Sequence, residues 1–241
     1  MQINKTKLDG PAVRNVKRVI LCVVRAICWP IYLARFKRGL RDGIMPSDGL
    51  LKSLVYHWGN AGYSADSAYL RQLLDVAFTH KDMTILECGS GLSTLLVGLV
   101  ADRNSHNLIA LEHHPAWAKK VQRQLEKAGV QSANVQLCPI RKYEEFDWYD
   151  SENIDLPSDN LIDFVICDGP PAQTRGGRVG LPYVMSGRLK TGCLVLADDT
   201  HRLPEQEILK DWKENYSFAI DDSRSGPHFT ALVFDSNRSV S

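Results

Sequence analysis

Short apolar runs alternate with helical segments through most of the chain. The runs read TILEC (84–88), NLIALE (107–112), NVQLCP (134–139), LIDFVIC (161–167) and GCLVLA (192–197). Helical patterns begin near Leu92, Pro115, Gly180 and Pro204. Strands that are apolar throughout and separated by helices are typical of a parallel sheet that is covered on both faces. The pattern therefore predicts a doubly wound α/β domain.

Further elements flank this alternation. YSFAID (216–221) and HFTALVF (228–234) are separated only by DSRSGP, so they are predicted to form an antiparallel hairpin. Before the first run, Ser64 is expected to cap a helical pattern. The preceding segment is turn-rich and is expected to be a linker or lid. Three parts are thus predicted: an N-terminal arm over 1–42, a linker or lid over 43–63, and the α/β domain over 64–241.

The N-terminal arm contains the apolar run VILCVVRAICWPIYLA over residues 19–34, with Arg25 in its middle. Sixteen residues are fewer than the ~20 that a helix needs to span a bilayer. The sequence RFKRG follows, which is not a signal-peptide cleavage pattern. On a helical wheel, three arginines share one sector and two aromatic residues lie near its edge: Arg14, Arg18, Arg25, Trp29 and Tyr32. The arm is predicted to be a basic amphipathic helix.

Two interpretations of this helix remain open. In one, residues 14–38 lie in the plane of a membrane surface, so that a cytoplasmic protein is peripheral at the inner face of the membrane. In the other, the helix packs on the rest of the protein or on a second subunit of a homodimer. A single-pass anchor comes third, because an unpaired arginine such as Arg25 is costly at the bilayer centre.

Charge is distributed unevenly along the chain. The formal net charge is +1, but residues 1–42 hold ten of the 29 basic and only two of the 28 acidic residues. The rest of the chain therefore carries a net charge of −7. The arm suits a polyanionic surface, whereas the acidic remainder disfavours nucleic acid as a partner.

Four of the six cysteines lie in apolar runs: Cys88, Cys138, Cys167 and Cys193. None of the six forms a CxxC pair. In such surroundings a cysteine behaves as a small apolar residue. Reduced core thiols are therefore expected rather than disulfides or a zinc site.

Acidic residues follow the predicted strands at their carboxyl ends, where doubly wound sheets bind ligands: Glu87, Glu112, Asp168, Asp198 and Asp199. The first strand leads into the glycine turn GSGLS. NAD would place its pyrophosphate on this turn, and Glu87 would repel it. S-adenosylmethionine (SAM) has no phosphate; it carries a sulfonium, an ammonium group and a ribose diol. Glu112 suits the ribose of either cofactor, but Glu87 and the terminal hairpin favour SAM.

Four segments in this order, ECGSGLST, IALEHHP, DFVICDGPP and GCLVLADDT, resemble motifs of the class I SAM-dependent methyltransferases. The resemblance covers about residues 64–235 and implies a mostly parallel seven-stranded sheet in the order 3-2-1-4-5-7-6. Ser93 takes the place of a third glycine often seen in the first motif, and it is expected to cap the following helix. The residues expected to bind SAM are Glu87, Gly89, Ser90, Gly91, Ser93, Glu112, His113 and Asp168. His113 and His114 are expected to flank the adenine.

Methyl transfer is an in-line displacement that needs a positioned nucleophile and a group that takes its proton. ICDGPP and LADDT resemble the catechol-type O-methyltransferases, whose acids after the fourth and fifth strands hold magnesium. This resemblance implies Asp168, Asp198 and Asp199 as ligands of Mg²⁺ or another divalent cation. In the alternative no metal binds, Asp198 contacts cofactor or substrate, and Asp199 caps a helix. The expected catalytic residues are Asp168, Asp198 and His201.

The loop GPPAQTRGGRVGLPYV follows the fourth strand. Arg175 and Arg178, together with His228 near the last strand, are expected to hold an anionic acceptor; solvated loop arginines are the alternative. The glycines in the middle of the loop are expected to loosen it. Trp148 and Tyr149 are expected to cover the adenine or the acceptor.

The sequence thus predicts a SAM-dependent methyltransferase acting on an oxygen of a small-molecule or glycan-like acceptor. DGPP, the arginine loop and ADDT also resemble bacterial methyltransferases of polysaccharide and secondary-metabolite pathways. One alternative is a catalytically silent cofactor-binding module that tethers partners through the arm. Another is RNA methylation, which the acidic body argues against. N-methylation is disfavoured because the chain has no Asn/Asp-Pro-Pro-aromatic segment.

Overall fold

The structure, a computed structural model, describes residues 11–60, 65–150, 152, 154–156 and 161–236, with side chains from Asn15 onward. Two compact units make up the chain, residues 1–64 and residues 65–241. The second unit contains the main sheet and all of the acidic strand ends predicted from the sequence.

A seven-stranded sheet forms the centre of the second unit. Its strands are β1 (Thr84–Cys88), β2 (Asn107–Glu112), β3 (Ala133–Leu137), β6 (Ile162–Cys167), β7 (Leu189–Ala197), β8 (Phe218–Ile220) and β9 (Thr230–Phe234). Their order is β3-β2-β1-β6-β7-β9-β8. All neighbours are parallel except β9, which runs antiparallel to β7 and β8. The predicted order 3-2-1-4-5-7-6 is confirmed, because β6 to β9 are the fourth to seventh strands of this sheet.

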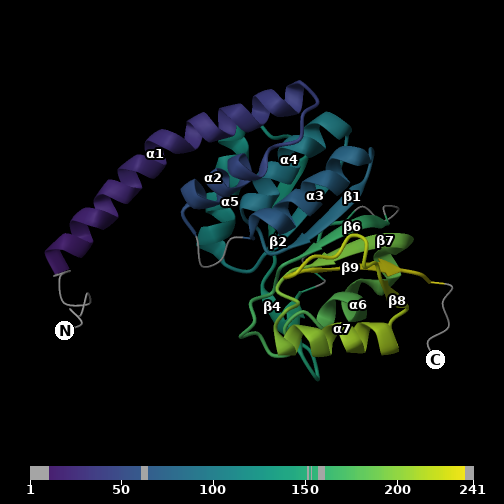
Figure 1. Ribbon diagram of the computed structural model, residues 1–241. Helices are drawn as coiled ribbons and strands as arrows, with labels where there is room; N and C mark the ends of the chain where they lie inside the picture. The colour runs from purple at the N-terminus through teal and green to yellow at the C-terminus, as the bar shows by residue number, and fades with distance from the viewer. Residues whose placement is uncertain (1–10, 61–64, 151, 153, 157–160, 237–241) are drawn as a thin grey trace, which may run out of the picture. The chain divides into compact units, whose positions relative to one another are not determined.

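Helices cover both faces of the sheet. They are α3 (Ser67–Thr79), α4 (Leu92–Asn104), α5 (Pro115–Ala128), α6 (Gly180–Met185) and α7 (Leu203–Asn215), with the short 3-10 helix η3 (Ser186–Arg188) after α6. Figure 1 shows α3, α4 and α5 on one face of the sheet, and α6 and α7 on the other. The helix starts predicted at Leu92, Pro115 and Gly180 are confirmed, and α7 begins one residue before Pro204.

The start of α3 differs from the prediction. Ser64 lies outside the described residues, and the described cap is Asp66. Its Oδ1 accepts hydrogen bonds from the backbone N–H groups of Ala68 and Tyr69, both at 2.8 Å. These bonds satisfy two of the N–H groups that a helix start leaves without partners.

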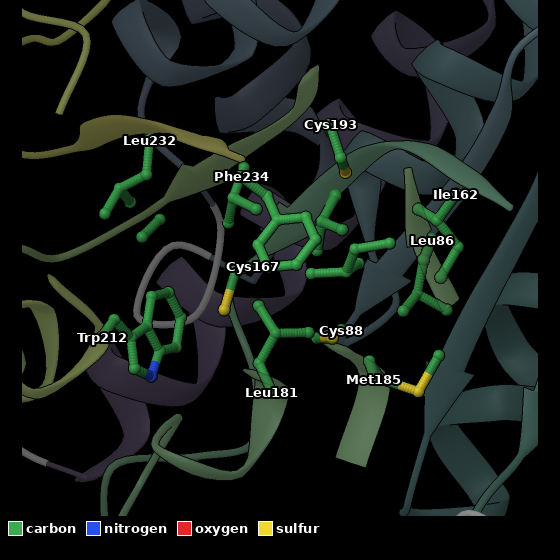
Figure 2. Close-up of a cluster of buried hydrophobic side chains, with 14 of the residues drawn as sticks. Leu86, Cys88, Ile162, Cys167, Leu181, Met185, Cys193, Trp212, Leu232 and Phe234 are labelled. Carbon is green, nitrogen blue, oxygen red and sulfur yellow. The ribbon is translucent and has the colours of Figure 1, made fainter. Parts of the chain in front are cut away.

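Apolar side chains from the strands and from α6 and α7 form the core beneath the sheet (Figure 2). Figure 2 shows Cys88, Cys167 and Cys193 among these side chains, together with Trp212 and Phe234. These three thiols and Cys138 are buried and free. The cysteines of the apolar runs therefore pack as small hydrophobic groups, as the sequence predicts.

A two-stranded hairpin, β4 (Ile140–Lys142) with β5 (Asp147–Tyr149), was not predicted. It places Trp148 and Tyr149 in the core, where both side chains are fully buried. The expectation that these two residues cover a ligand is therefore wrong. The loop glycines also differ from expectation, because a Cβ at Gly180 would lie 2.5 Å from Cγ of Trp148. Gly180 permits close packing rather than loosening the loop.

The first unit consists of α1 (Pro11–Arg41) and α2 (Asp48–Trp58). The predicted N-terminal helix is confirmed. The turn-rich structure expected of residues 43–63 is wrong for residues 48–58, which form α2. Ser47 caps this helix by accepting from the backbone N–H of Leu50 at 3.3 Å, and Gly59 ends it in the left-handed conformation. Residues that suggested turns thus mark the two ends of a helix.

Three side-chain pairs join the two helices of this unit: Arg25 with Tyr56 (5.3 Å from guanidinium carbon to ring centre), Trp29 with Trp58 (5.3 Å between ring centres) and Tyr32 with His57 (4.8 Å). Arg25 lies over the face of the Tyr56 ring, a favourable cation–π geometry. In the membrane-surface interpretation, Trp29 and Tyr32 border a charged stripe. In the structure both rings pack toward α2, as the packed-helix interpretation expects.

We expect Gly180→Ala to lower the free energy of unfolding by about 1–3 kcal/mol, because the added methyl group has no room beside Trp148. Urea unfolding measures this as a lower midpoint at an unchanged slope. Gly187→Ala is the matched control, because a Cβ there meets nothing within 4 Å. Equal midpoints for the two variants would contradict the close packing at Gly180.

Candidate active site

The glycine turn after β1 begins at Gly89, whose φ of +92° favours glycine. Its N–H donates to the carbonyl of Leu111 at 3.0 Å, which ties the turn to β2. A Cβ at Gly89 would lie 3.3 Å from the backbone nitrogen of Gly169, in the loop after β6. The turn is therefore closely packed between the ends of the two neighbouring strands.

Glu112, the last residue of β2, turns its carboxylate toward the glycine turn. Its Oε2 accepts from the N–H and the hydroxyl of Ser90, at 3.2 and 2.9 Å. Its Oε1 accepts from the N–H of His114 at 2.8 Å and lies 3.3 Å from Nδ1 of His113. The structure thus brings together Ser90, Glu112 and His113, which are three of the residues expected to bind SAM.

The charge state of Glu112 follows from these contacts. Burial raises the pKa of the carboxyl, but the hydrogen bonds from His113, from the N–H of His114 and from Ser90 outweigh it, so the pKa is lowered. Glu112 is therefore an ionised hydrogen-bond acceptor beside the turn. His114 has a different role, because its Nδ1 caps α5 by accepting from the N–H of Trp117 at 3.3 Å.

Glu87 lies beneath the turn and is fully buried. Ser93 donates its hydroxyl to Oε1, while Oε2 has no hydrogen-bond partner among the described residues. Burial raises the pKa of this carboxyl to about 8, against the hydrogen bonds of Ser93 and Thr94. Ser93 is therefore not the helix cap that was expected; Gly91 occupies the cap position, and Ser93 lies inside α4 and contacts the buried acid.

Asp168 and Arg178 meet at the carboxyl ends of β6 and β7. The buried guanidinium of Arg178 donates to the carbonyl of Asp168 at 2.7 Å and to its Oδ1 at 3.2 Å, and also to the carbonyl of Asp198. Burial raises the pKa of the Asp168 carboxyl, and the charge of Arg178 partly opposes this rise. One side chain thus joins the ends of two adjacent strands.

Asp198 and Asp199 differ in their surroundings although they are adjacent. Burial and then the charge of Asp168 raise the pKa of the Asp198 carboxyl to about 7. Asp199 pairs with Arg202 at 2.8 Å and lies 3.6 Å from Arg178. Asp198 is therefore the acid of this pair whose charge is least compensated by the protein.

The predicted metal ligands Asp168, Asp198 and Asp199 do not form a cation site. No group of three side chains suited to hold a metal occurs in the part of the chain that the structure describes. The guanidinium of Arg178 lies within 3.2 Å of Asp168 and 3.6 Å of Asp199, where a cation would need those oxygens. The residues present therefore fit an internal arginine rather than Mg²⁺.

The two loop arginines expected to hold an anionic substrate are engaged with the protein itself. Arg178 is buried among acids and carbonyls, and its Nη1 lies 3.8 Å from the buried carboxylate of Glu205. Arg175 donates to the carbonyls of Tyr143 and Phe146 and to Asp147, which ties the loop to the β4–β5 hairpin. These contacts give no support to substrate binding by either arginine.

Two histidines lie together in the loops that follow β7 and precede β9. The rings of His201 and His228 are 4.7 Å apart between centres. Nδ1 of His228 lies 3.2 Å from Oδ2 of Asp66, the residue that caps α3 with its other oxygen. The side chains of His228 and Asp66 are partly open to solvent, with exposed fractions of 55% and 43%.

Three residues of the site were missed in the sequence: Asp66, Arg202 and Glu205. Asp66 carries a local signal, since an aspartate before an apolar periodic segment is a common helix cap. Its pairing with His228 joins positions 162 residues apart, which no local pattern indicates. Glu205 reads as an ordinary first-turn acid, and only the fold brings it to Arg178.

No protein-family model matches the chain, and no curated protein matches it in sequence. Several solved structures match its fold. The SAH-bound methyltransferase PaMTH1 of Podospora anserina aligns over 98% of this chain and 100% of its own, at 13% identity and a TM-score of 0.59. The O-methyltransferase TomG of Streptomyces achromogenes is involved in tomaymycin synthesis and was solved with SAM. It aligns over 72% of this chain and 82% of its own, at 14% identity and a TM-score of 0.53. An O-methyltransferase of Bacillus cereus in complex with SAH aligns over 83% of this chain and 96% of its own, at 15% identity and a TM-score of 0.53.

At these identities the likeness shows the fold. The predicted resemblance to class I SAM-dependent methyltransferases is therefore confirmed at the level of architecture. A shared fold does not by itself fix an activity, because function depends on the site that the fold carries.

The raised pKa of Glu87 predicts a loss of stability as the pH rises. The carboxyl has a pKa of about 8 when folded and an ordinary value near 4.5 when unfolded, so the unfolded chain loses this proton first. Between these values the free energy of unfolding falls with rising pH. Glu87→Gln cannot ionise, so its stability should not show this fall. We compare the free energy of unfolding of Glu87→Gln with that of wild type below pH 4.5 and again above pH 8. We expect the difference to shift in favour of the variant by at least 2 kcal/mol, roughly, between the two pH ranges.

Denaturant unfolding at a series of pH values measures this effect. Glu126→Gln is the control, because Glu126 is an exposed acid of α5 and its replacement should leave the pH dependence unchanged. Parallel pH profiles for wild type and Glu87→Gln would show that Glu87 is not held as a neutral acid.

Proposed function

We propose that the chain is an enzyme that transfers the methyl group of SAM to an oxygen of a small-molecule or glycan-like acceptor. The observation that carries this proposal is the arrangement of acids around the glycine turn. An ionised Glu112 lies at the turn, while burial raises the pKa values of Glu87, Asp168 and Asp198 nearby. Buried acids that lack full compensation favour a ligand that is cationic and rich in hydroxyl donors.

SAM has these properties, whereas a dinucleotide brings a pyrophosphate into the same position. When bound, SAM supplies an electrophilic methyl group on a positively charged sulfur. Glu112 is suited to accept from the ribose hydroxyls, and Gly89 and Gly91 allow close approach of a ligand to the backbone at the turn. The fold neighbours support this assignment, because TomG and the Bacillus cereus enzyme are described as O-methyltransferases and were solved with SAM and SAH.

We assign the role of proton acceptor to His228. A carboxylate oxygen accepts hydrogen bonds, so the contact of Asp66 Oδ2 with Nδ1 favours the tautomer of His228 that has its proton on Nδ1 and Nε2 as the accepting nitrogen. A ring nitrogen held in this way is suited to take the proton of an acceptor hydroxyl as the methyl group is transferred. His201, expected from the sequence to be catalytic, contacts the His228 ring but shows no comparable carboxylate partner among the described residues.

The chain's own groups supply the remaining requirements of the reaction. Arg178 fixes the positions of Asp168 and Asp198 and carries the charge that a divalent cation would otherwise provide there. We therefore propose that the transfer depends on positioning, on the charge of the acid cluster and on a histidine base. No step requires a metal at the three aspartates.

Glu112→Ala is expected to weaken the binding of both SAM and SAH at least tenfold, because the ribose hydroxyls lose a charged acceptor. Isothermal titration calorimetry of the purified chain measures the affinities. Glu126→Ala is the control, since it removes an exposed acid of the helix that follows Glu112. Unchanged affinity in Glu112→Ala would exclude the proposed position of the ribose.

His228→Gln is expected to lower the rate of turnover by about 10²–10⁴-fold and to leave SAH affinity unchanged, once a panel of hydroxyl compounds has provided an acceptor. Asp66→Ser separates the two roles of Asp66, because serine retains the cap of α3 and removes the partner of His228. We expect Asp66→Ser to lower the rate without lowering the melting temperature. Wild-type turnover in both variants would exclude the histidine base, and SAM binding without turnover of any acceptor would favour a silent module.

A further inference from the structure

One side of α1 is apolar and exposed to solvent. Seven side chains define this apolar face, with exposed fractions between 41% and 62%: Val16, Val19, Ile20, Val23, Val24, Ile27 and Ile31. Their spacing of three and four residues places them along one side of the helix. The face extends over about 23 Å of helix at 1.5 Å per residue. A contiguous apolar patch of this length on the surface of a protein marks an interaction site.

The opposite side of α1 is occupied by α2. Arg25, Trp29 and Tyr32, which contact α2, lie about half a turn away from the apolar face on the helical wheel. The two interpretations drawn from the sequence therefore apply to different sides of one helix. One side packs within the protein, and the other presents branched apolar residues outward.

Basic residues lie at both ends of the apolar face. Lys17 and Arg18 lie at its start, and Arg35, Lys37, Arg38 and Arg41 follow its end. Helix α1 has no aspartate or glutamate at all. The charged side chains of α1 are therefore all basic, and they suit an anionic surface.

We propose that the apolar face of α1 docks in the plane of a bilayer that contains anionic lipids. Apolar side chains would enter the boundary between head groups and acyl chains, and the basic ends would lie among the anionic head groups. A helix from Asn15 to Arg41 is also long and apolar enough to cross a membrane, a criterion that core helices and signal sequences meet as well. The in-plane orientation fits better, because crossing would bring Arg25 and the exposed Lys52 of α2 toward the hydrocarbon.

A second copy of the chain is a weaker occupant for this face. Two α1 helices packed through their apolar faces would bring basic ends against basic ends in either direction, with no acidic residue on α1 to compensate. Like charges at such short range oppose association. An anionic bilayer removes the same repulsion, so charge favours the membrane over the homodimer.

Vesicle flotation of the full-length protein tests the proposal. We use vesicles of neutral phosphatidylcholine and vesicles that also contain anionic phosphatidylglycerol, at low and high ionic strength. Wild type should float with the anionic vesicles, and high salt should weaken this binding. Arg35→Gln/Arg38→Gln/Arg41→Gln should lower partitioning about a hundredfold, at about 1 kcal/mol for each charge removed. Ile20→Glu/Ile27→Glu should lower it at least tenfold.

Leu161→Glu is the control, since Leu161 is an exposed apolar residue of the other unit. Circular dichroism during heating confirms that each variant is folded, and light scattering gives its mass in solution. The proposal is overturned if wild type does not float with anionic vesicles, or if Ile20→Glu/Ile27→Glu floats as wild type does. A wild-type dimer that this double variant converts to a monomer, without a change in flotation, would assign the face to a second copy.

Discussion

The arrangement of the candidate site depends on one buried cation. Arg178 donates to the carbonyls of Asp168 and Asp198, which end β6 and β7, and it lies beside the carboxylates of Asp168 and Asp199. Without this guanidinium, several acids would remain close together in a poorly solvated region, which is strongly unfavourable. The sheet can therefore present an acid-lined edge because a loop residue before α6 neutralises part of it from within.

Arg178 does not neutralise all of the buried acids, and the acids that it leaves uncompensated affect which ligand the site can bind. Burial raises the pKa of Glu87 to about 8, and burial together with the charge of Asp168 raises that of Asp198 to about 7, although Arg178 partly lowers the latter. Glu112, by contrast, is stabilised as an anion by its hydrogen bonds to the turn. The site thus combines a fixed hydrogen-bond acceptor with acids that a cationic ligand would stabilise. Such a site favours SAM, which is positively charged at its sulfur, over a dinucleotide, which carries a negatively charged pyrophosphate.

The sequence predicted the strands and helices of the sheet well, because buried parallel strands are continuous apolar runs that differ clearly from helices. The strand order came from the resemblance rather than from spacing. Contacts across the fold were not predictable. Arg178 looked like a substrate arginine because burial cannot be read from a loop, and Asp66 gave no sign of its distant partner His228. Helix α2 was missed because Ser47 and Gly59, which cap its two ends, are residue types that are also typical of turns.

The central claim is that the acid cluster binds SAM with Arg178, not a divalent cation, as its internal counter-charge. The most direct test is calorimetric titration of the wild-type chain with SAM, once in the presence of a chelator and once with added Mg²⁺. The account predicts binding in both conditions with the same affinity. Absence of binding in both, or binding that requires Mg²⁺, would contradict it.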